Sequence, residues 1–326
     1  MTALVTADLH LSSNPRDSYR FAAMSRLAEV IEKNKVSTLI VLGDLTEEKN
    51  HHPATLVNDV VELFHIFSEL VDQVICMMGN HDYTDADVPF FHFLRRLNNV
   101  SWVGKPQEAE DNCLFLPHTL NYKRDWEKQN MKGFDWIFAH NTFDGALTEH
   151  GKKLTGIPLN VFPKDAKVIS GDIHTPQTLG CLTYVGSPYT VDFGDAFEPR
   201  CLLLSGDRMR SVPLPGPQKR LLELNHGYLP RDLAVNHSDV VKVRFNLLEK
   251  YREDWPEIRA DIRSKLEDLC CVVYAIQPVL EKAARSASVT SKRYVKSDEE
   301  MVKTFGKQYR ASEQMMHIGL ALTENG

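Results

Sequence analysis

The 326-residue chain has no long apolar run and few cysteines. No apolar run approaches the roughly 18–20 residues that a membrane-spanning helix needs, so we predict no membrane span and no membrane partner. The segment Met1–His10 has no basic stretch and reaches an acidic residue at Asp8, which argues against a secretory signal. These absences favour a cytoplasmic protein.

The six cysteines form no C-x-x-C pair, which excludes a zinc knuckle and a disulfide framework. They lie mostly inside apolar runs, so we expect buried thiols in a reducing compartment. The sequence also has no Gly-x-Gly-x-x-Gly turn after a strand, no phosphate-binding loop ending in Gly-Lys-Ser/Thr and no Gly-x-Ser-x-Gly elbow. Any ATPase that works with this protein is therefore expected to be a separate chain.

Positive charge is scarce in the first two thirds of the chain. Residues 1–218 hold 20 Lys and Arg against 28 Asp and Glu, a net charge of −8, whereas residues 219–326 carry +2. Within the second part, Lys282–Arg310 has eight Lys and Arg against three acidic residues. Because a negative region repels phosphate groups, a phosphate substrate bound there would need a cation between the two.

What the chain does contain is alternation between short apolar runs and helical patterns. Amphipathic helices are predicted around Phe21–Lys33 and over Ala54–Val71, each between two strands. The alternation is typical of an α/β fold with helices on both faces of a sheet. The predicted strands are Ala3–Ala7, Thr38–Leu42, Val74–Met78, Ile137–Ala139, Val168–Ser170 and Cys201–Leu204.

Length and composition predict two domains, at about 150 residues each. We expect a catalytic domain over 1–210 and a Pro-rich linker over 211–235. A small α/β cap over 236–326 would contain a strand at Val240–Leu247, a helix at Pro256–Leu269 and a strand at Cys270–Ile276, followed by a basic helical tail.

Polar groups that bind metals follow five of the predicted strands. These are Asp8 and His10, Asp44, Asn80 with His81 and Asp82, His140, and Asp172 with His174. Parallel strands would place all five sets along one carboxyl edge, where open α/β sheets bind ligands. Each motif alone is weak evidence, since a single Asp-x-His is common and a single His is usually a loop or hydrogen-bonded residue. Their conjunction predicts a site.

The donor types suit divalent ions such as Mn²⁺, Fe²⁺ or Zn²⁺. In an extended Asp-x-His pair both side chains point to the same side, so Asp8 and His10 can reach one ion. A carboxylate in the middle of the edge, such as Asp44, can bridge two ions. Two ions about 3.5–4 Å apart clamp a phosphoryl group and convert a water to a hydroxide nucleophile.

Taken together, these motifs resemble the five-motif signature of the calcineurin-like metallophosphoesterases over about residues 1–205. The resemblance implies a β-sandwich flanked by helices and a centre of two metal ions. One ion would be held by Asp8, His10, Asp44 and His174, and the other by Asp44, Asn80, His140 and Asp172. His81 would act near the scissile phosphate as general acid or transition-state stabiliser, with Asp82 orienting it.

One position departs from the family pattern. The last motif usually reads Gly-His-x-His, but here Asp172 stands at the first histidine. A carboxylate adds negative charge and favours Mn²⁺ or Mg²⁺ over softer metals, unless the second metal site is weak or Asp172 is only structural. Mn²⁺ is therefore the expected metal, with Mg²⁺, Fe²⁺ and Zn²⁺ as alternatives. His51 and His52 either reach the substrate or belong to a solvated helix start.

Within the superfamily, the order of segments most resembles the SbcD-type nucleases of DNA repair and recombination. The resemblance rests on Thr175-Pro176-Gln177 and Tyr184–Pro188 after the last motif, on the strand–helix–strand cap, and on the charged tail. It implies a Mn²⁺-dependent DNA nuclease, with an SMC-like ATPase as a possible partner. A homodimer through Ala54–Val71 and the segment before Leu97 is also possible. Alternatives are a small-molecule phosphodiesterase or phosphatase, and a non-catalytic scaffold.

Overall fold

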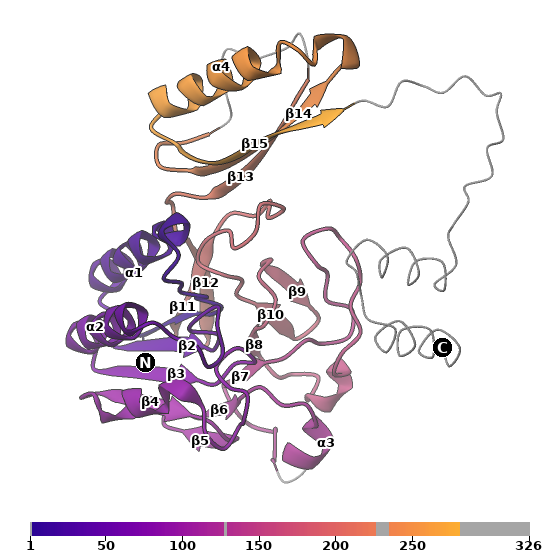
Figure 1. Ribbon diagram of the computed structural model, residues 1–326. Helices are drawn as coiled ribbons and strands as arrows, with labels where there is room; N and C mark the ends of the chain where they lie inside the picture. Colours follow the sequence, from indigo (N-terminus) through magenta and orange to yellow (C-terminus); the bar gives the residue numbers. More distant parts are fainter. Residues whose placement is uncertain (1, 127–128, 226–234, 281–326) are drawn as a thin grey trace, which may run out of the picture. The chain divides into compact units, whose positions relative to one another are not determined.

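The computed structural model describes residues 2–126, 129–225 and 235–280 (Figure 1). The basic segment Lys282–Arg310 and the predicted tail lie outside the described residues. In the described part of the chain, no helix is both long and apolar enough to span a membrane.

The first sheet contains four parallel strands that follow each other in space in chain order. Strands β1 (Thr2–Thr6), β2 (Thr38–Leu42), β3 (Gln73–Met77) and β4 (Val100–Val103) are all parallel. Strands β11 (Arg200–Ser205) and β12 (Arg208–Pro213) extend the sheet beyond β1 as an antiparallel hairpin. The sheet order is therefore β12-β11-β1-β2-β3-β4.

The second sheet also has six strands, in the order β5-β6-β7-β8-β10-β9. Its parallel centre consists of β6 (Cys113–Leu116), β7 (Trp136–His140), β8 (Val168–Gly171) and β10 (Leu182–Tyr184). The antiparallel edges are β5 (Gln107–Ala109) and β9 (Gln177–Leu179). Most of these strands have only three or four residues, too few to show a clear pattern in the sequence.

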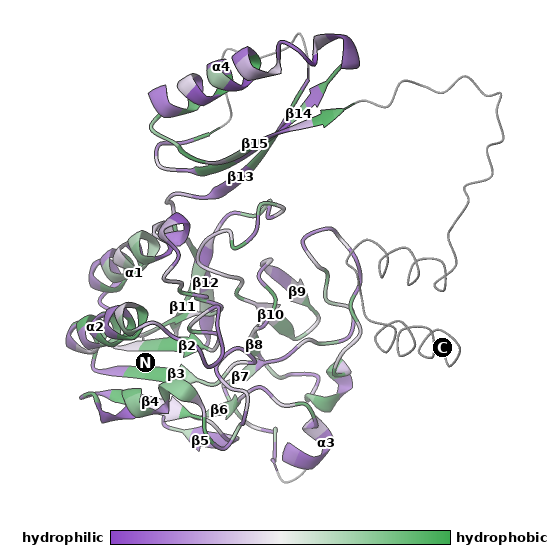
Figure 2. Ribbon diagram, viewed as in Figure 1, coloured by the Kyte–Doolittle hydropathy of each residue, from purple (hydrophilic) through white to green (hydrophobic). Residues whose placement is uncertain are grey.

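The two sheets pack face to face. Val5, Ile40 and Ile75 of the first sheet share one buried cluster with Phe138 and Ile169 of the second. The β-sandwich that the resemblance implied is therefore present, and it replaces the single sheet that alternation alone suggested. Figure 2 shows apolar residues along the strands of both sheets.

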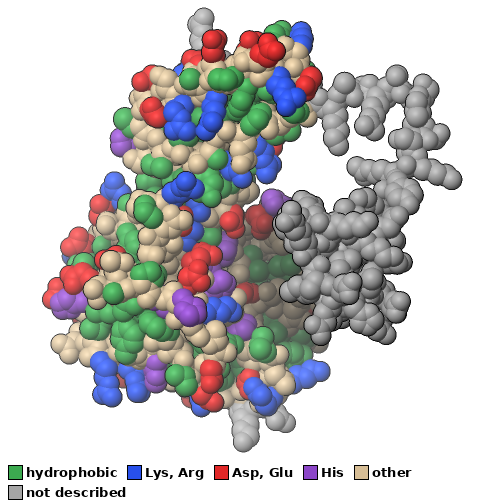
Figure 3. Space-filling view, viewed as in Figure 1, with side chains coloured by type: hydrophobic (Ala, Val, Ile, Leu, Met, Phe, Trp, Pro, Cys, Tyr) green, Lys and Arg blue, Asp and Glu red, His purple; other side chains and the backbone are tan. Residues whose placement is uncertain are grey.

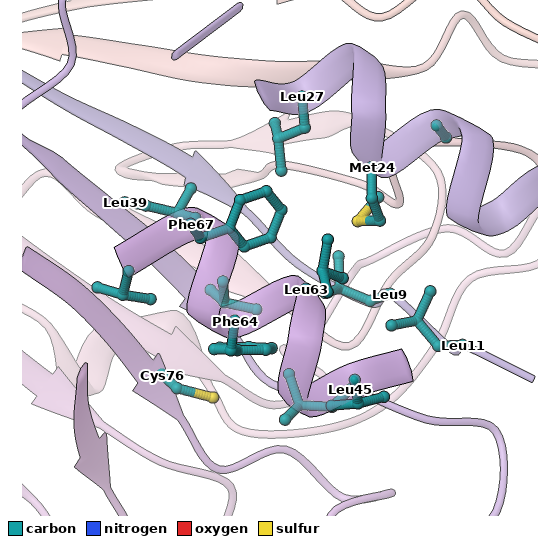
Figure 4. Packing of buried hydrophobic residues seen from close by; sticks show 14 of the residues in the cluster. Leu9, Leu11, Met24, Leu27, Leu39, Leu45, Leu63, Phe64, Phe67 and Cys76 are labelled. Carbon is teal, nitrogen blue, oxygen red and sulfur yellow. The ribbon is translucent and has the colours of Figure 1, made fainter. Parts of the chain in front are cut away.

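Two helices cover the outer face of the first sheet. Helices α1 (Tyr19–Asn34) and α2 (Ala54–Leu70) lie against it, close to their predicted positions. Met24 and Leu27 of α1 and Phe64 and Phe67 of α2 are buried against Leu39 of β2 (Figure 4). The second sheet is covered instead by loops and short helices, with Phe143 and Phe162 in its outer cluster.

Within the described residues, the cap contains three parallel strands and one α-helix. Strands β13 (Lys219–Asn225), β14 (Val240–Leu247) and β15 (Val272–Leu280) form a sheet, and α4 (Trp255–Asp268) connects the last two. The predicted strand–helix–strand unit is therefore present, with one further strand. Strand β13 and part of β12 fall inside the stretch 211–235 that was expected to be a linker. The domain boundaries themselves stay a prediction.

Candidate metal centre

All five polar sets that the sequence singled out lie at the carboxyl ends of parallel strands. Asp8, Asp44 and Asn80 follow β1, β2 and β3 of the first sheet. His140 ends β7, and Asp172 follows β8, in the second sheet. The ligands therefore come from two sheet edges that meet, and not from the edge of one sheet. Figure 3 shows histidine and acidic side chains gathered in a hollow on the face in view.

The backbone at the site is unusual. Asp8, His10, Asp44 and Asp172 all have positive φ angles, at 55°, 40°, 55° and 83°. This left-handed region is sparsely populated by residues other than glycine, and such strain clusters at functional sites. It turns each carboxylate or imidazole away from the direction that a continuing strand would give it.

Two glycines allow the loops after β2 and β3 to touch. A Cβ atom on Gly43, whose φ is +85°, would lie 2.6 Å from the Cα of Gly79. A Cβ on Gly79 would lie 2.3 Å from Oδ1 of Asp44. No other residue fits at either position, so the Gly-Asp and Gly-Asn-His-Asp motifs are physically coupled.

The carboxylate of Asp44 lies at the middle of the site. Its Oδ2 is 3.6 Å from Nε2 of His10, and its Oδ1 is 3.4 Å from Nε2 of His140. In the described part of the chain, three sets of side chains have ligand atoms within 4.8 Å of one another: Asp8, His10 and His174; His10, Asp44 and His81; and Asp8, Asp44 and His140. We call the pair His10 and His174 the His10 side, and the pair His140 and Asn80 the His140 side.

Several contacts in the site are ones that a cation would stabilise. Nε2 of His10 and Nε2 of His174 face each other at 3.1 Å. On the other side, one polar atom of the Asn80 amide lies 3.0 Å from Nε2 of His140 and 3.0–3.2 Å from both oxygens of Asp44. Asp8 is fully buried, and its Oδ2 has no hydrogen-bond partner among the described residues. A buried acceptor without a partner is costly, so these residues fit a centre of divalent ions.

Burial and neighbouring charge shift the pKa values of Asp8 and Asp44 in opposite directions. Burial raises the pKa of Asp8 to about 6, against the opposing charges of His140 and His174. Burial acts the same way on Asp44, but the charge and hydrogen bond of His140, together with His10, hold the pKa of Asp44 below its usual value. Asp44 therefore stays ionised, as a bridging ligand must.

Asp172 stands apart from the other expected ligands. Its carboxylate belongs to none of the three ligand sets and accepts a hydrogen bond from the hydroxyl of Thr142. Its backbone N–H donates to Oδ1 of Asp8 at 2.9 Å. The structure therefore gives Asp172 a role in holding Asp8, and its role as a metal ligand stays a prediction.

His81 and Asp82 do not form the pair that the resemblance implied. The ring of His81 lies 4.8 Å from that of His10, and its Nδ1 is 2.8 Å from the carbonyl oxygen of Glu47. Asp82 is buried and accepts backbone N–H bonds from Asp44, Leu45 and Gly79, at 2.6–2.9 Å. Asp82 therefore ties two loops together, and a main-chain carbonyl holds the His81 ring.

His51 and His52, the adjacent pair before helix α2, differ in their surroundings. His52 contacts the hydroxyl of Thr46 and the carbonyl of Glu48 through Nε2, and it packs against Phe90 and Phe91. His51 is exposed. Contact of either with the substrate is a prediction that these packing contacts do not favour.

Sequence reasoning missed two residues beside the centre. Glu47 accepts a hydrogen bond from buried Arg20, and its carboxylate lies 3.7 Å from Nδ1 of His10. His118 follows β6, and its ring lies 6.2 Å from that of His140. His118 could have been found from its position two residues after a strand, as the other site residues were. The four-residue strand β6, however, was not predicted.

Comparison with known proteins supports the expected relationship. Residues 1–176 match the family model described as calcineurin-like phosphoesterase. Exonuclease subunit 1 of Enterobacteria phage T4 is 22% identical over 213 residues, which cover 61% of this chain and 63% of that protein. The chain thus spans less than two thirds of the length of this relative.

Three solved structures are also similar. A novel archaeal phosphodiesterase (13% identical, TM-score 0.38) covers 66% of this chain and is itself fully covered. YfcE, a phosphoesterase from E. coli, is 15% identical with a TM-score of 0.36, and the match covers 66% of this chain and 93% of YfcE. Pseudomonas putida nuclease MPE is 14% identical with a TM-score of 0.33, and the match covers 64% of this chain and 87% of that nuclease.

The family match includes every residue that the resemblance implied as a metal ligand, from Asp8 to His174. The match covers more than half of the chain, and it confirms the family resemblance that the five motifs indicated. The chain belongs to the calcineurin-like phosphoesterase family, whose members bind two divalent metal ions.

Proposed function

We propose that this protein is a metal-dependent phosphodiester hydrolase that cleaves DNA, with Mn²⁺ as its metal. The observation that carries the proposal is the convergence of Asp8, His10, Asp44, His140 and His174, with His81 at the same centre. The name of the T4 relative, an exonuclease subunit, supports DNA as the substrate. The carboxylates favour Mn²⁺ over softer ions.

The proposed ligands divide as the motifs implied. Asp8, His10, Asp44 and His174 would hold one ion, and Asp44, Asn80, His140 and Asp172 the other. When bound, two divalent ions neutralise the phosphoryl oxygens and lower the pKa of a water molecule. The acidic first part of the chain, with its net charge of −8, can then accept a phosphate, because the local charge differs from the net charge.

His81 is the proposed general acid. Its Nδ1 proton is held by the carbonyl oxygen of Glu47, which leaves Nε2 for the substrate; the tautomer is assigned from this bond. In its protonated form His81 donates the Nε2 proton to the leaving oxygen as the P–O bond breaks, and the ring returns to the neutral state.

A substrate panel tests the proposal. Linear DNA, circular DNA, cyclic nucleotides and an aryl phosphodiester are incubated with Mn²⁺ or with chelator. We expect Mn²⁺-dependent degradation of linear DNA, and a loss of about 10²–10⁴-fold in His81→Asn with Mn²⁺ binding retained. His65→Ala, an exposed histidine on α2, is the control. Hydrolysis of small substrates alone would replace the nuclease by a small-molecule phosphodiesterase, and no hydrolysis at all would refute both.

A partner chain is the second part of the proposal. The T4 relative is named as a subunit, which supports an assembly with another chain, such as an SMC-like ATPase. A homodimer is the alternative assembly. The mass of the purified chain by light scattering, alone and after co-expression with such an ATPase, distinguishes the two. A monomer that does not associate with the ATPase would contradict both.

A further inference from the structure

The segment that carries His118 is fixed by the two loops that carry Asn80 and His140. The backbone N–H of His118 donates to the carbonyl of Met78, directly before the Gly-Asn-His-Asp motif, at 3.0 Å. The next residue, Thr119, is held by the side-chain amide of Asn141, which directly follows His140. That amide accepts from the Thr119 N–H and donates to the Thr119 carbonyl, at 3.3 and 2.9 Å.

The imidazole of His118 is also held. Its Nδ1 lies 2.8 Å from the hydroxyl of Tyr83, the residue after Asp82. Its ring is nearly perpendicular to that of His140, at 82°, with the centroids 6.2 Å apart. Among the described residues, no hydrogen bond reaches Nε2 of His118. The ring is half-buried, so this nitrogen is the one polar atom of the side chain that is left for a ligand.

Burial and neighbouring positive charge both disfavour the charged form of His118. Burial, and then the charge of His140, lower the pKa of His118 to about 4, despite the opposing effect of Asp44. Lys49 and His81 lower the pKa of His118 in the same direction as His140. The Tyr83 hydroxyl can donate or accept, and we assign it as the donor to Nδ1, which places the proton of a neutral imidazole on Nε2.

We propose that His118 is a substrate-binding residue whose Nε2–H donates a hydrogen bond to a non-bridging oxygen of the substrate phosphate on the His140 side. Tyr83 is the positioning residue that fixes the tautomer. The proposal rests on the proposed function as a phosphoester hydrolase and adds a contact outside the metal ligands. His81 contacts the His10 side, so the two histidines have separate places at the centre.

The test compares His118→Ala, His118→Gln and Tyr83→Phe. A hydrogen bond to the phosphate forms in the ground state as well as in the transition state, so its loss raises KM and leaves kcat nearly unchanged. We expect His118→Ala to raise KM for the DNA substrate about tenfold, since hydrogen bonds to charged groups are among the stronger ones. His118→Gln, whose amide can donate, recovers most of the loss, and Tyr83→Phe raises KM about threefold, within the range of a single neutral hydrogen bond.

A binding measurement separates this proposal from the function on which it rests. Calorimetric titration of the Mn²⁺-loaded protein with inorganic phosphate should show about tenfold weaker binding in His118→Ala. Mn²⁺ affinity and melting temperature should match those of the wild type, and His65→Ala should behave as the wild type throughout. Unchanged phosphate affinity in His118→Ala, or a fall in kcat at constant KM, would overturn the proposal. Absence of all hydrolysis in the wild type, with the phosphate effect intact, would refute the proposed hydrolase function and leave His118 as a phosphate-binding residue.

Discussion

The two sides of the metal centre differ in how their histidines are held. On the His140 side, the fully buried His140 has its Nδ1 fixed by the carbonyl of Leu42, which lies at the end of β2 in the opposite sheet. On the His10 side, Nδ1 of His10 has no hydrogen-bond partner among the described residues, and Nε2 faces another imidazole. The β-sandwich therefore preorganises the His140 side, whereas no hydrogen bond among the described residues fixes Nδ1 of His10.

This difference indicates an order of metal binding. A donor that is already oriented loses little entropy when it binds, so we expect the His140 side to bind first and more tightly. Asp44 lies between the two sides, and its carboxylate contacts His10 on one and His140 on the other.

Asp44→Asn would have the largest effect, because it removes the shared negative charge while keeping the size of the side chain. We expect the affinity for both Mn²⁺ ions to fall by at least about 100-fold, and DNA cleavage to fall by about 10³-fold. Calorimetric titration with Mn²⁺ and a cleavage assay measure the two effects. Asp59→Asn, at an exposed position of α2, is the matched control. Two Mn²⁺ ions bound at wild-type affinity in Asp44→Asn would rule out the bridging role.

His140→Ala and His10→Ala test whether the two sides of the centre contribute unequally to the stability of the metal-free protein. Without metal, His140→Ala leaves the buried Leu42 carbonyl unpaired, so the free energy of unfolding should fall by about 2–3 kcal/mol. His10→Ala removes a ring whose Nδ1 has no hydrogen-bond partner among the described residues, and should lower the free energy of unfolding by less than His140→Ala does. Urea denaturation with chelator measures both.

With Mn²⁺, the same two variants should differ in stoichiometry. His10→Ala should retain about one tightly bound ion, on the His140 side. Equal loss of stability in the two variants, or two ions bound to His10→Ala, would show that the two sides are equivalent.

The sequence predicted the His10 side and the His140 side equally well, because both depend on residues at the ends of strands. Asp8, Asp44 and Asn80 follow short apolar runs, and a parallel β-strand has to end in a loop at one edge. The difference between the two sides could not be predicted. It depends on the contact of His140 with Leu42, which lies 98 residues away in the chain and in the other sheet.

The fold also divides into elements that the sequence predicts and elements that it does not. Strand β2 and helix α2 were predicted nearly to the residue, since each has an uninterrupted apolar pattern. Strands β5, β6, β9 and β10 were not predicted, because a run of three or four residues carries little periodicity. The hydrogen bonds of Asp82 could not be predicted, since the motif places it beside His81 in sequence while its carboxylate accepts from the backbone of the neighbouring loops.

Substitutions of Asp172 test the metal affinity of the His140 side, and we expect them to change it less than Asp44→Asn does. If its carboxylate completes the second metal site, Asp172→Ala should weaken binding of the second Mn²⁺ about tenfold. Asp172→His should shift the preference from Mn²⁺ towards Zn²⁺, since imidazole suits the softer ion. Competition titrations of the two ions measure this preference. Wild-type Mn²⁺ affinity in Asp172→Ala would assign the residue only to the backbone bond that holds Asp8.

The smallest effect concerns the pH dependence of stability on the His140 side. The pKa of His118 is about 4 in the folded protein, below the ordinary value of 6.5. Between these pH values the unfolded chain binds more protons at this residue than the folded chain, so the free energy of unfolding falls as pH drops from about 6.5 to 4. In the metal-free protein, His118→Gln should reduce this fall by about 1–2 kcal/mol, whereas His65→Gln, at an exposed site, should leave it unchanged. Urea denaturation at both pH values measures the difference, and an equal fall in all three proteins would mean that His118 titrates as a solvent-exposed histidine.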